Sequence, residues 1–355
     1  MSRTRPHRFS RAIRPARRQR GLSLIELMIS VAIGLVILTA IALVFLNASR
    51  TRTELERVSR QIENGRYAIE LLSHDLRMAG FYGELDVAQI AGTALPADPC
   101  SLTASDWNTA IPVHIQGYDN GGFVSANCAL TNQKANTDVV IVRRARACLA
   151  GAAACDAHVA GTPYLQVSLC PTDPGTARHA LGVDSSIFTF RKKDCATTAE
   201  KRQYYVHIYY VSTDNGQGEA IPTLKRLQLA YSGGVVGWTD MPLVEGIEEF
   251  QMEYGLDQDG DGAPDAYAAD PTDFPVGACA GACPLNNWMN VVTGRISILA
   301  RNLEASPDYT DIKTYELGND KNGTAITVTP ADNFRRHVYS GLVRIANVSN
   351  RRDTP

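Results

Sequence analysis

One uncharged segment near the N-terminus limits what this chain can fold into. Residues 27–46 carry no charge, and their apolar character is interrupted only by Ser30, Gly34 and Thr39. In a helix, twenty residues rise about 30 Å, which matches the hydrocarbon core of a bilayer. Residues 1–20 contain eight arginines and no acidic residue, and such a basic flank marks the cytoplasmic side. The sequence therefore predicts a single membrane-spanning helix over residues 22–46, with the rest of the chain exported.

Glu26 is an unusual residue for the start of such a helix. A carboxylate within a membrane segment costs a few kcal/mol unless it is paired. A cut between Gly21 and Leu22 would place a new amino group about one helical turn from Glu26, where the two charges could neutralise each other or pair between neighbouring subunits. The alternative is an uncleaved signal anchor with Glu26 at the membrane interface, which leaves the spacing from Gly21 to Glu26 unexplained.

These residues resemble a known signal. A basic leader that ends in Gly21, followed by an apolar helix with Glu26 at its fifth position, is similar to the class III signal of type IV pilins and pseudopilins. The resemblance implies that residues 1–21 are a leader, that a prepilin peptidase cleaves between Gly21 and Leu22, and that the new N-terminus at Leu22 is methylated. It also implies a role for Glu26 in assembly, through pairing with that N-terminus.

The helix is predicted to continue well beyond the membrane segment. A single apolar stripe with alternating spacings of three and four residues follows it: Leu55, Val58, Ile62, Gly65, Ile69, Leu72, Leu76 and Ala79. No proline occurs between Leu22 and Ala79, and Gly80 suits a C-terminal cap, so one helix over residues 22–80 is expected. Residues 66–83, which run through Arg77, Met78, Ala79 and Gly80, resemble the end of the long helix in PilW-type minor pilins. Residues 14–50, 244–265 and 338–348 also resemble that family.

The remainder of the chain reads mainly as β-structure. Alternating or β-branched runs predict strands at residues 138–143, 164–169, 187–190, 204–211, 224–231, 250–254, 295–301 and 338–348. Residues 84–135 and 266–288 are expected to be mostly irregular. The fold class is therefore α+β, with antiparallel sheets packed on the second half of the long helix. The sequence leaves open whether residues 81–355 form one lobe or two.

The charge and the cysteine content indicate that the part of the chain after the membrane segment is exported. Removal of residues 1–21 takes away eight arginines and no acid, which changes the formal net charge from −2 to −10 and argues against nucleic acid as the main partner. All eight cysteines follow the membrane segment, which predicts disulfides in an oxidising compartment. The two short loops favour the pairs Cys148–Cys155 and Cys279–Cys283, although zinc is an alternative for the second. The other four cysteines are left without an assigned pairing: Cys100, Cys128, Cys170 and Cys195.

One group of acidic residues matches a cation-binding pattern. Asp257, Asp259, Asp261 and Asp265 occupy positions 1, 3, 5 and 9 of a calcium loop, and Ala263 offers its carbonyl at position 7. Position 12 is Ala268 instead of the usual glutamate, and no flanking helices are expected, so a further ligand would come from Asp270 or elsewhere. The pattern predicts a Ca²⁺ site, and the alternative is a solvated turn between strands.

The sequence contains no recognisable catalytic set. Its seven histidines are scattered, and no glycine-rich loop follows a strand in the manner of a phosphate site. His207, within a predicted strand, is interpreted as a sheet residue. The chain is therefore predicted not to be an enzyme.

The resemblance implies a function. A PilW-type minor pilin is a structural subunit of a priming or tip complex that starts pilus assembly and supports adhesion and twitching motility. Its partners would be other minor pilins, the major pilin, the inner-membrane assembly platform, the prepilin peptidase and a tip adhesin. It would cross the inner membrane of a Gram-negative bacterium once, with a periplasmic body, and then reach the pilus at the cell surface. The alternatives are a pseudopilin of type II secretion and a membrane-anchored adhesive or ligand-binding protein that does not polymerise.

Overall fold

A computed structural model describes residue 21 and residues 23–87, 90, 92, 94–96, 98–173, 178–274 and 283–352. The chain divides into two compact units, residues 1–55 and residues 56–355. Helix α1 (Leu24–Met78) begins in the first unit and ends in the second. Each unit is described by itself below.

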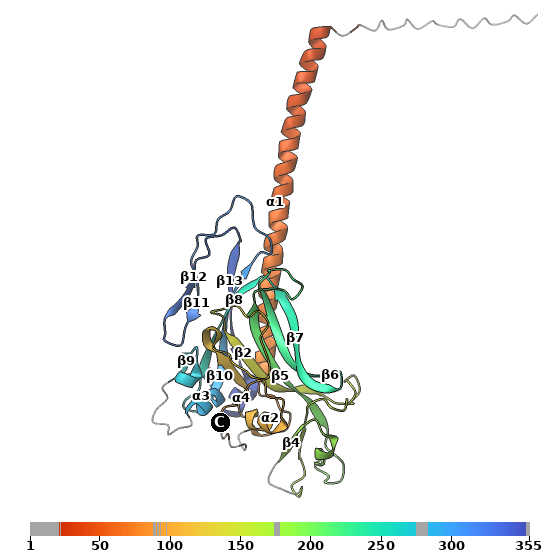
Figure 1. Cartoon of the computed structure of the whole chain (residues 1–355), viewed down its shortest axis with the longest axis vertical. Coiled ribbons are helices and arrows are strands. Elements are labelled where there is room, and N and C mark those ends of the chain that lie inside the picture. Colours follow the sequence, from red (N-terminus) through yellow and green to blue (C-terminus); the bar gives the residue numbers. More distant parts are fainter. Residues whose placement is uncertain are drawn as a thin grey trace, which may run out of the picture. The chain divides into compact units, whose positions relative to one another are not determined.

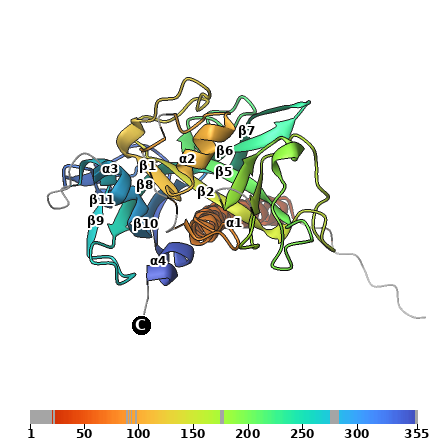
Figure 2. The ribbon, with the colours of Figure 1, turned by 90° about the horizontal axis from the view of Figure 1, so that it is seen from below.

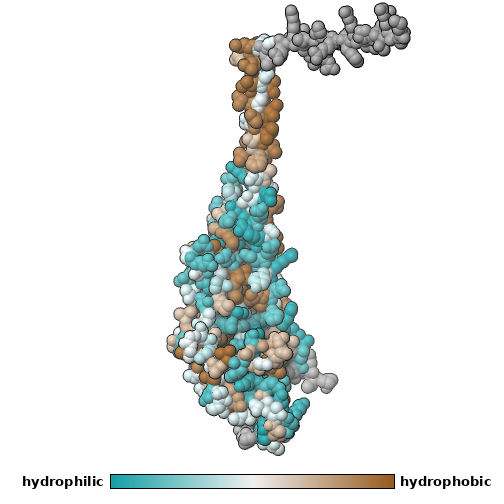
Figure 3. Space-filling view, turned by 90° about the vertical axis from the view of Figure 1, so that its right-hand side faces the viewer, coloured by the Kyte–Doolittle hydropathy of each residue, from teal (hydrophilic) through white to brown (hydrophobic). Residues whose placement is uncertain are grey.

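The first unit consists of the apolar part of α1. Within the described residues, α1 is the single helix that is long and apolar enough to cross a membrane, and the mean hydropathy of its most apolar window is 2.9. The large apolar side chains of this part are more than half exposed, and in the space-filling view hydrophobic residues flank a paler strip along it (Figure 3). An exposed surface of this composition is what a lipid-facing segment needs.

The second unit contains a seven-stranded antiparallel sheet, seen in Figure 1. Its strands are β1 (Ile115–Tyr118), β2 (Val139–Leu149), β3 (Tyr164–Val167), β4 (His179–Gly182), β5 (Lys201–Ser212), β6 (Thr223–Ser232) and β7 (Val235–Glu245). The long strand β5 is central, because it pairs with β2, β3 and β6. β7 pairs with β6 alone and forms an edge of the sheet.

A second, four-stranded antiparallel sheet has the order β13-β10-β8-β9. These strands are β8 (Ile247–Leu256), β9 (Ala266–Ala268), β10 (Val291–Arg301) and β13 (Arg336–Arg344). The hairpin β11 (Tyr315–Asn319) and β12 (Ala325–Val328) forms a small sheet of its own. Three short helices complete the unit: α2 (Ala104–Ala110), α3 (Cys283–Met289) and α4 (Ala346–Arg352).

The main core lies where the last turns of α1 meet both sheets. Leu72 and Leu76 of α1 share one cluster of buried apolar residues with Val140 of β2 and Phe250 of β8. Seen nearly end-on in Figure 2, α1 has β2 and α4 beside it. The opposite face of the seven-stranded sheet is covered by residues that follow α1, among them Tyr82 and Trp107. Because both faces of this sheet are buried, the start of β2 (residues 139–142) and most of β5 (residues 204–211) are nearly continuous apolar and aromatic runs instead of alternating.

Polar contacts also fix α1 along its length within the second unit. The Gln61 side-chain amide donates to the carbonyls of Ala300 (2.8 Å) and Arg335 (3.2 Å). One turn further, the Asn64 amide donates to the carbonyl of Glu245 (3.1 Å). These bonds satisfy backbone carbonyls at the ends of strands, so the helix is held by hydrogen bonds as well as by apolar packing.

The predicted long helix and the antiparallel α+β architecture are confirmed. The buried face of α1 is, however, rotated from the predicted stripe, since Gln61 and Ala68 are buried while Leu55 and Ile62 are exposed. Gly65 explains the choice of face, because a Cβ there would lie 2.2 Å from the Tyr339 ring. The close approach of β13 therefore requires a residue without a side chain.

One predicted strand, at residues 187–190, is wrong, and another, at residues 338–348, is too long. Residues 187–190 were expected to form a strand, but a 3-10 turn (Ser185–Ile187) ends at the first of them and the other three are in no strand. The Asp184 side chain caps this turn by accepting the Ser186 N–H. β13 ends at Arg344, and α4 replaces the rest of the predicted strand over residues 338–348. In both places a local turn or cap competes with a short apolar run.

Candidate functional site

The predicted processing site lies directly before α1. Ser23 accepts a hydrogen bond through its hydroxyl from the backbone N–H of Glu26 (3.2 Å), and its carbonyl accepts one from the N–H of Leu27 (3.1 Å). Ser23 therefore caps the helix, and Glu26 stands at the third helical position, as in a capping box. Gly21 precedes this cap, and Leu22 lies outside the described residues.

The cap gives Glu26 a local reason to be where it is. A carboxylate in the first helical turn is stabilised by the positive end of the helix dipole. Glu26 is exposed and has no resolved side-chain partner in the described part of the chain. The first turn of α1 thus holds the Glu26 carboxylate in a defined position, where it can pair with a positive charge from outside this turn. The cap itself can be found in the sequence, since Ser23 and Glu26 have the Ser-x-x-Glu spacing.

The aspartate loop connects β8 to β9. Asp257 is fully buried, and its two carboxylate oxygens accept the backbone N–H groups of Gly260 (2.6 Å) and Gly262 (3.0 Å). Both glycines have a positive φ, 86° and 82° respectively, which a residue with a side chain adopts rarely. Asp257 therefore organises the turn from its centre.

Three of the four predicted carboxylates converge. One oxygen each from Asp257, Asp259 and Asp265 lies within 4.8 Å of the others, a spacing that suits one cation with oxygen ligands. Asp261 is outside this group, and its side chain accepts the N–H of Ala263 (2.8 Å). Asp270, considered as a further ligand, instead caps the turn Pro271–Asp273 by accepting the Thr272 N–H (2.8 Å). The residue at position 12, Ala268, is part of β9.

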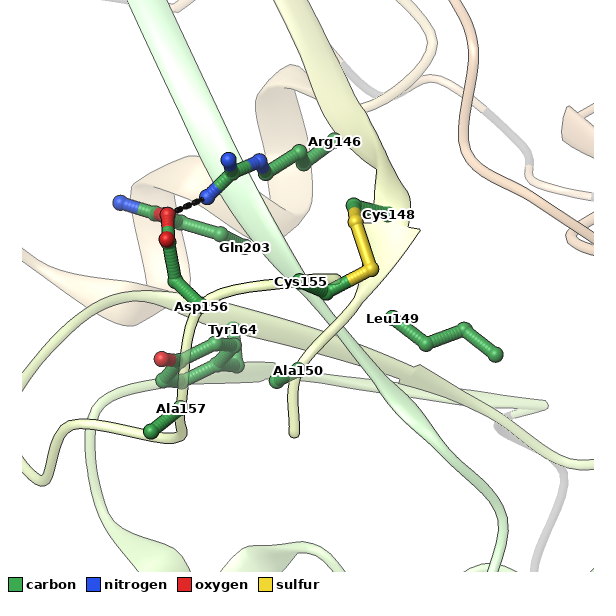
Figure 4. A pocket seen from close by; sticks show the side chains of 9 residues that line it. All are labelled: Arg146, Cys148, Leu149, Ala150, Cys155, Asp156, Ala157, Tyr164 and Gln203. Atoms are coloured by element: carbon green, nitrogen blue, oxygen red, sulfur yellow. Dashed lines mark hydrogen bonds and ion pairs between the residues drawn. A yellow bond between two sulfur atoms is a disulfide. The ribbon is translucent and has the colours of Figure 1, made fainter. Parts of the chain in front are cut away.

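The disulfides are all in the second unit. Cys148 is bonded to Cys155, as the short loop predicts, and the two other pairs are Cys100–Cys128 and Cys170–Cys195. Cys283 is disulfide-bonded as well, and Cys279 lies outside the described residues. Figure 4 shows Arg146 and Asp156 forming an ion pair beside the Cys148–Cys155 bond. The space enclosed there is about 10 Å³, which holds no more than one water, so the disulfide closes a loop and not a ligand site.

Sequence reasoning missed a buried ionic cluster around Asp75 of α1. Its carboxylate accepts hydrogen bonds from Arg144 Nε of β2 (2.6 Å), from His207 Nδ1 (2.7 Å) and from the hydroxyl of Tyr209, both on β5 (2.9 Å). Burial acts to raise the pKa of Asp75, but the hydrogen bonds from His207 and Arg144 and the positive charge of Arg144 outweigh it and hold that pKa well below its usual range. The pKa of His207 is lowered, chiefly by burial.

These shifts define the charge state of the cluster. Asp75 is ionised, Arg144 supplies the compensating positive charge, and neutral His207 donates its Nδ1–H to the carboxylate. His207 Nε2 is buried and has no partner among the described residues. The hydrogen bonds of Asp75 join α1 to β2 and β5, and His207 lies within β5. A charged residue at position 75, beside the buried Leu72 and Leu76, is the sequence signal that could have indicated this cluster.

Comparison with known families adds two matches. The family described as Type IV Pilus-assembly protein W matches residues 208–347, which extend from β5 to the start of α4. The prokaryotic N-terminal methylation motif matches residues 16–42, which include Gly21, Leu22 and Glu26. No curated protein matches the chain.

Among solved structures, a type IV-like pilin from Thermus thermophilus is similar. The sequences are 13% identical, the match covers 83% of this chain and 97% of that pilin, and the TM-score is 0.32. A likeness at this distance transfers no detail. The similarity rests instead on two matches, the methylation motif at the start of the apolar helix and the pilus-assembly family over residues 208–347. In these two segments the chain resembles type IV pilus-related pilins of the PilW type.

Proposed function

We propose that this chain is a minor pilin, a structural subunit without catalytic activity, in the complex that primes pilus assembly and lies at the pilus tip. The observation that supports the proposal is the match to the N-terminal methylation motif over residues 16–42, which include Gly21, Leu22 and Glu26 and the start of the apolar helix. Through that complex the chain supports adhesion and twitching motility.

The same proposal defines partners and location. The prepilin peptidase removes residues 1–21 and methylates Leu22, and the assembly platform of the inner membrane then receives the subunit. The chain crosses the inner membrane of a Gram-negative bacterium once, keeps its body in the periplasm, and moves to the pilus with other minor pilins, the major pilin and a tip adhesin. In the assembled complex, the Glu26 carboxylate neutralises an N-terminal amino group, its own or a neighbour's.

The alternative of a type II secretion pseudopilin shares the N-terminal signal. The match to the pilus-assembly family over residues 208–347 favours the pilus. A membrane-anchored adhesive protein that does not polymerise would keep its leader and would have no use for the Gly21–Leu22 junction.

The test combines two variants in cells that assemble pili, with the wild-type copy deleted. Gly21→Phe is expected to leave the full precursor, because the bulky side chain blocks cleavage. Glu26→Ala is expected to be cleaved normally, since its apolar segment becomes more apolar, but to be nearly absent from sheared pili. Intact mass measures the N-terminus, and immunoblots of the pilus fraction measure incorporation.

Ser23→Ala is the matched control, because it weakens the helix cap by about 1 kcal/mol while Glu26 stays in place. It should be cleaved and incorporated. Wild-type protein that starts at Met1 would refute the pilin proposal, and normal incorporation of Glu26→Ala would refute the pairing role alone.

We also propose that the loop between β8 and β9 binds one Ca²⁺ ion through Asp257, Asp259, Asp261 and Asp265 and the Ala263 carbonyl. The converging oxygens of Asp257, Asp259 and Asp265 support the proposal. Three carboxylates so close together repel one another, and a hard cation with oxygen ligands offsets that repulsion. Joining this set requires the Asp261 side chain to leave the Ala263 N–H.

Calcium is therefore expected to raise the melting temperature of the mature protein in detergent. At a hundredfold excess over the dissociation constant the stabilisation is about 2.7 kcal/mol, or several degrees. Asp259→Ala with Asp261→Ala should show no gain, whereas Asp184→Ala with Asp194→Ala, which removes two carboxylates elsewhere, should gain as the wild type does. Equal melting of the wild type in calcium and in a chelator would reduce the loop to a turn.

A further inference from the structure

A cationic cleft lies beside α1 in the second unit. It is formed by Val58, Gln61, Ile62, Arg66, Tyr309, Lys313, Arg335, Arg336, His337 and Tyr339, and encloses about 340 Å³. That volume is within the range of sites that bind small ligands or one to two side chains. Four of the ten described lining residues are Lys or Arg, and none is acidic. The cleft is thus positive in a chain whose mature body is acidic.

The four cations differ in their surroundings. Arg336 is neutralised within the protein by ion pairs with Glu248, Asp332 and Asp311. The Arg66 guanidinium and the Lys313 ammonium are exposed and form no ion pair with any described residue. These two side chains approach the cleft from separate elements, α1 and the segment before β11. Both cations are therefore available to an anionic ligand in the cleft.

The walls of the cleft suit a ligand that is partly apolar. Val58 and Ile62 contribute apolar surface from α1, and the Arg335 guanidinium stacks on the Tyr309 ring at 4.1 Å. The hydroxyl of Tyr339 is buried and has no hydrogen-bond partner among the described residues. A buried hydroxyl without a partner is unfavourable, and a ligand carboxylate can accept a hydrogen bond from it.

We propose that this cleft binds a segment of a neighbouring pilin-family subunit, in which an Asp or Glu beside an apolar residue enters between Arg66 and Lys313. The identity of the partner rests on the proposed function. Charge complementarity selects the acidic side chain, and the Val58–Ile62 surface selects its apolar neighbour.

The lining favours a protein over a lipid headgroup. Tyr and Arg, which make up five of the ten lining residues, are the residues that dominate binding energy in protein interfaces. Phosphate sites instead gather backbone N–H groups at a helix N-terminus, and Arg66 lies well inside α1, which starts at Leu24. An anionic lipid is therefore the outcome to be separated by experiment.

The test uses the full chain in pilus-assembling cells, with the photo-crosslinking residue p-benzoyl-phenylalanine in place of Tyr309. After illumination, a crosslink to another pilin-family subunit is expected, and mass spectrometry should place it within a few residues of an Asp or Glu. Arg66→Glu with Lys313→Glu should lower the crosslink yield about tenfold or more. Arg77→Glu with Lys193→Glu, the same charge change at two exposed positions outside the cleft, should leave it unchanged.

Charge exchange completes the design. Replacing the crosslinked acid of the partner by lysine should restore crosslinking to the Arg66→Glu, Lys313→Glu chain. Incorporation into pili without a pilin crosslink, a phospholipid adduct, or a yield unaffected by the double reversal would each overturn the inference while the proposed function stands. Wild-type protein that is never incorporated would overturn the proposed function itself.

Discussion

Replacing Asp75 by alanine is expected to destabilise the folded protein by about 3–5 kcal/mol. Removal of one member of a buried ionic group leaves the others without compensation. In this variant Arg144, His207 Nδ1 and the Tyr209 hydroxyl would all lose their common acceptor. Each of them lies on the seven-stranded sheet, so α1 would lose its main ionic connection to that sheet. The urea midpoint of the mature protein in detergent, followed by near-UV circular dichroism, measures the loss.

Asp156→Ala provides the matched control. Asp156 also pairs with an arginine, Arg146, but its side chain is 76% exposed, against 5% for Asp75. An exposed pair contributes about 0–1 kcal/mol, so this variant should be almost as stable as the wild type. If both variants shift the midpoint equally, the Asp75 cluster does not stabilise the protein as argued here.

A second large effect is expected from pH. Asp138, at the start of β2, is buried, and its carboxylate accepts the N–H groups of Asn120 (2.9 Å) and Met252 (2.7 Å). Burial raises the pKa of Asp138 to about 8, despite these two hydrogen bonds. Since Met252 belongs to β8, this carboxyl group lies where the two sheets meet.

The sign follows from proton linkage. Between the unfolded pKa of about 3.9 and the folded pKa of about 8, the folded state binds more protons, so stability falls as the pH rises. From pH 6.5 to pH 9 the expected loss is about 2 kcal/mol for this group. Asp75, whose folded pKa is lowered, contributes stability that is lost only under acidic conditions. His207, whose folded pKa is also lowered, loses stability as the pH falls through the unfolded value of about 6.5. Its effect therefore has the opposite sign to that of Asp138 and is confined to the lower end of the window.

Unfolding of the wild type and of Asp138→Asn should therefore be compared at pH 6.5, 7.5, 8.5 and 9. The asparagine variant should lose the fall in stability over this window, whatever its absolute stability, because it cannot ionise. Asp240→Asn, the same change at an exposed aspartate of β7, should keep the wild-type slope. A fall of the same size in the Asp138→Asn protein would show that another group is responsible.

The elements predicted well from sequence are those in which pattern and environment agree. α1 is long and uninterrupted, and β2 and β5 carry apolar runs because both faces of their sheet are buried. β7 was missed since its sequence contains Gly237 and Pro242 and its side chains are largely exposed. Within sheets, proline is confined to edge strands. Pro242 therefore makes β7 difficult to predict from the sequence, and it also agrees with the position of β7 at the edge of the sheet.

The sites predicted from the sequence are those whose residues lie close together in it, and the sites that were missed combine residues far apart in it. The Ser23–Glu26 cap, the Cys148–Cys155 pair and the Asp257–Asp265 loop each lie within a few residues, and their spacing indicates the geometry. The Asp75 cluster joins residues 132 positions apart, and the cleft combines α1 with residues beyond position 300. No local pattern contains that information, because it depends on how the chain packs.

The contacts of α1 within the second unit have a mechanical consequence. Gln61 and Asn64 hold the helix to the ends of strands, and Asp75 holds it to β2 and β5, so the attachments are spread along its axis. A load directed along that axis acts on all of these contacts together, instead of breaking them one after another. The lifetime of the subunit under tension is then governed by its unfolding rate, which requires the simultaneous rupture of these contacts together with the apolar interface beneath them.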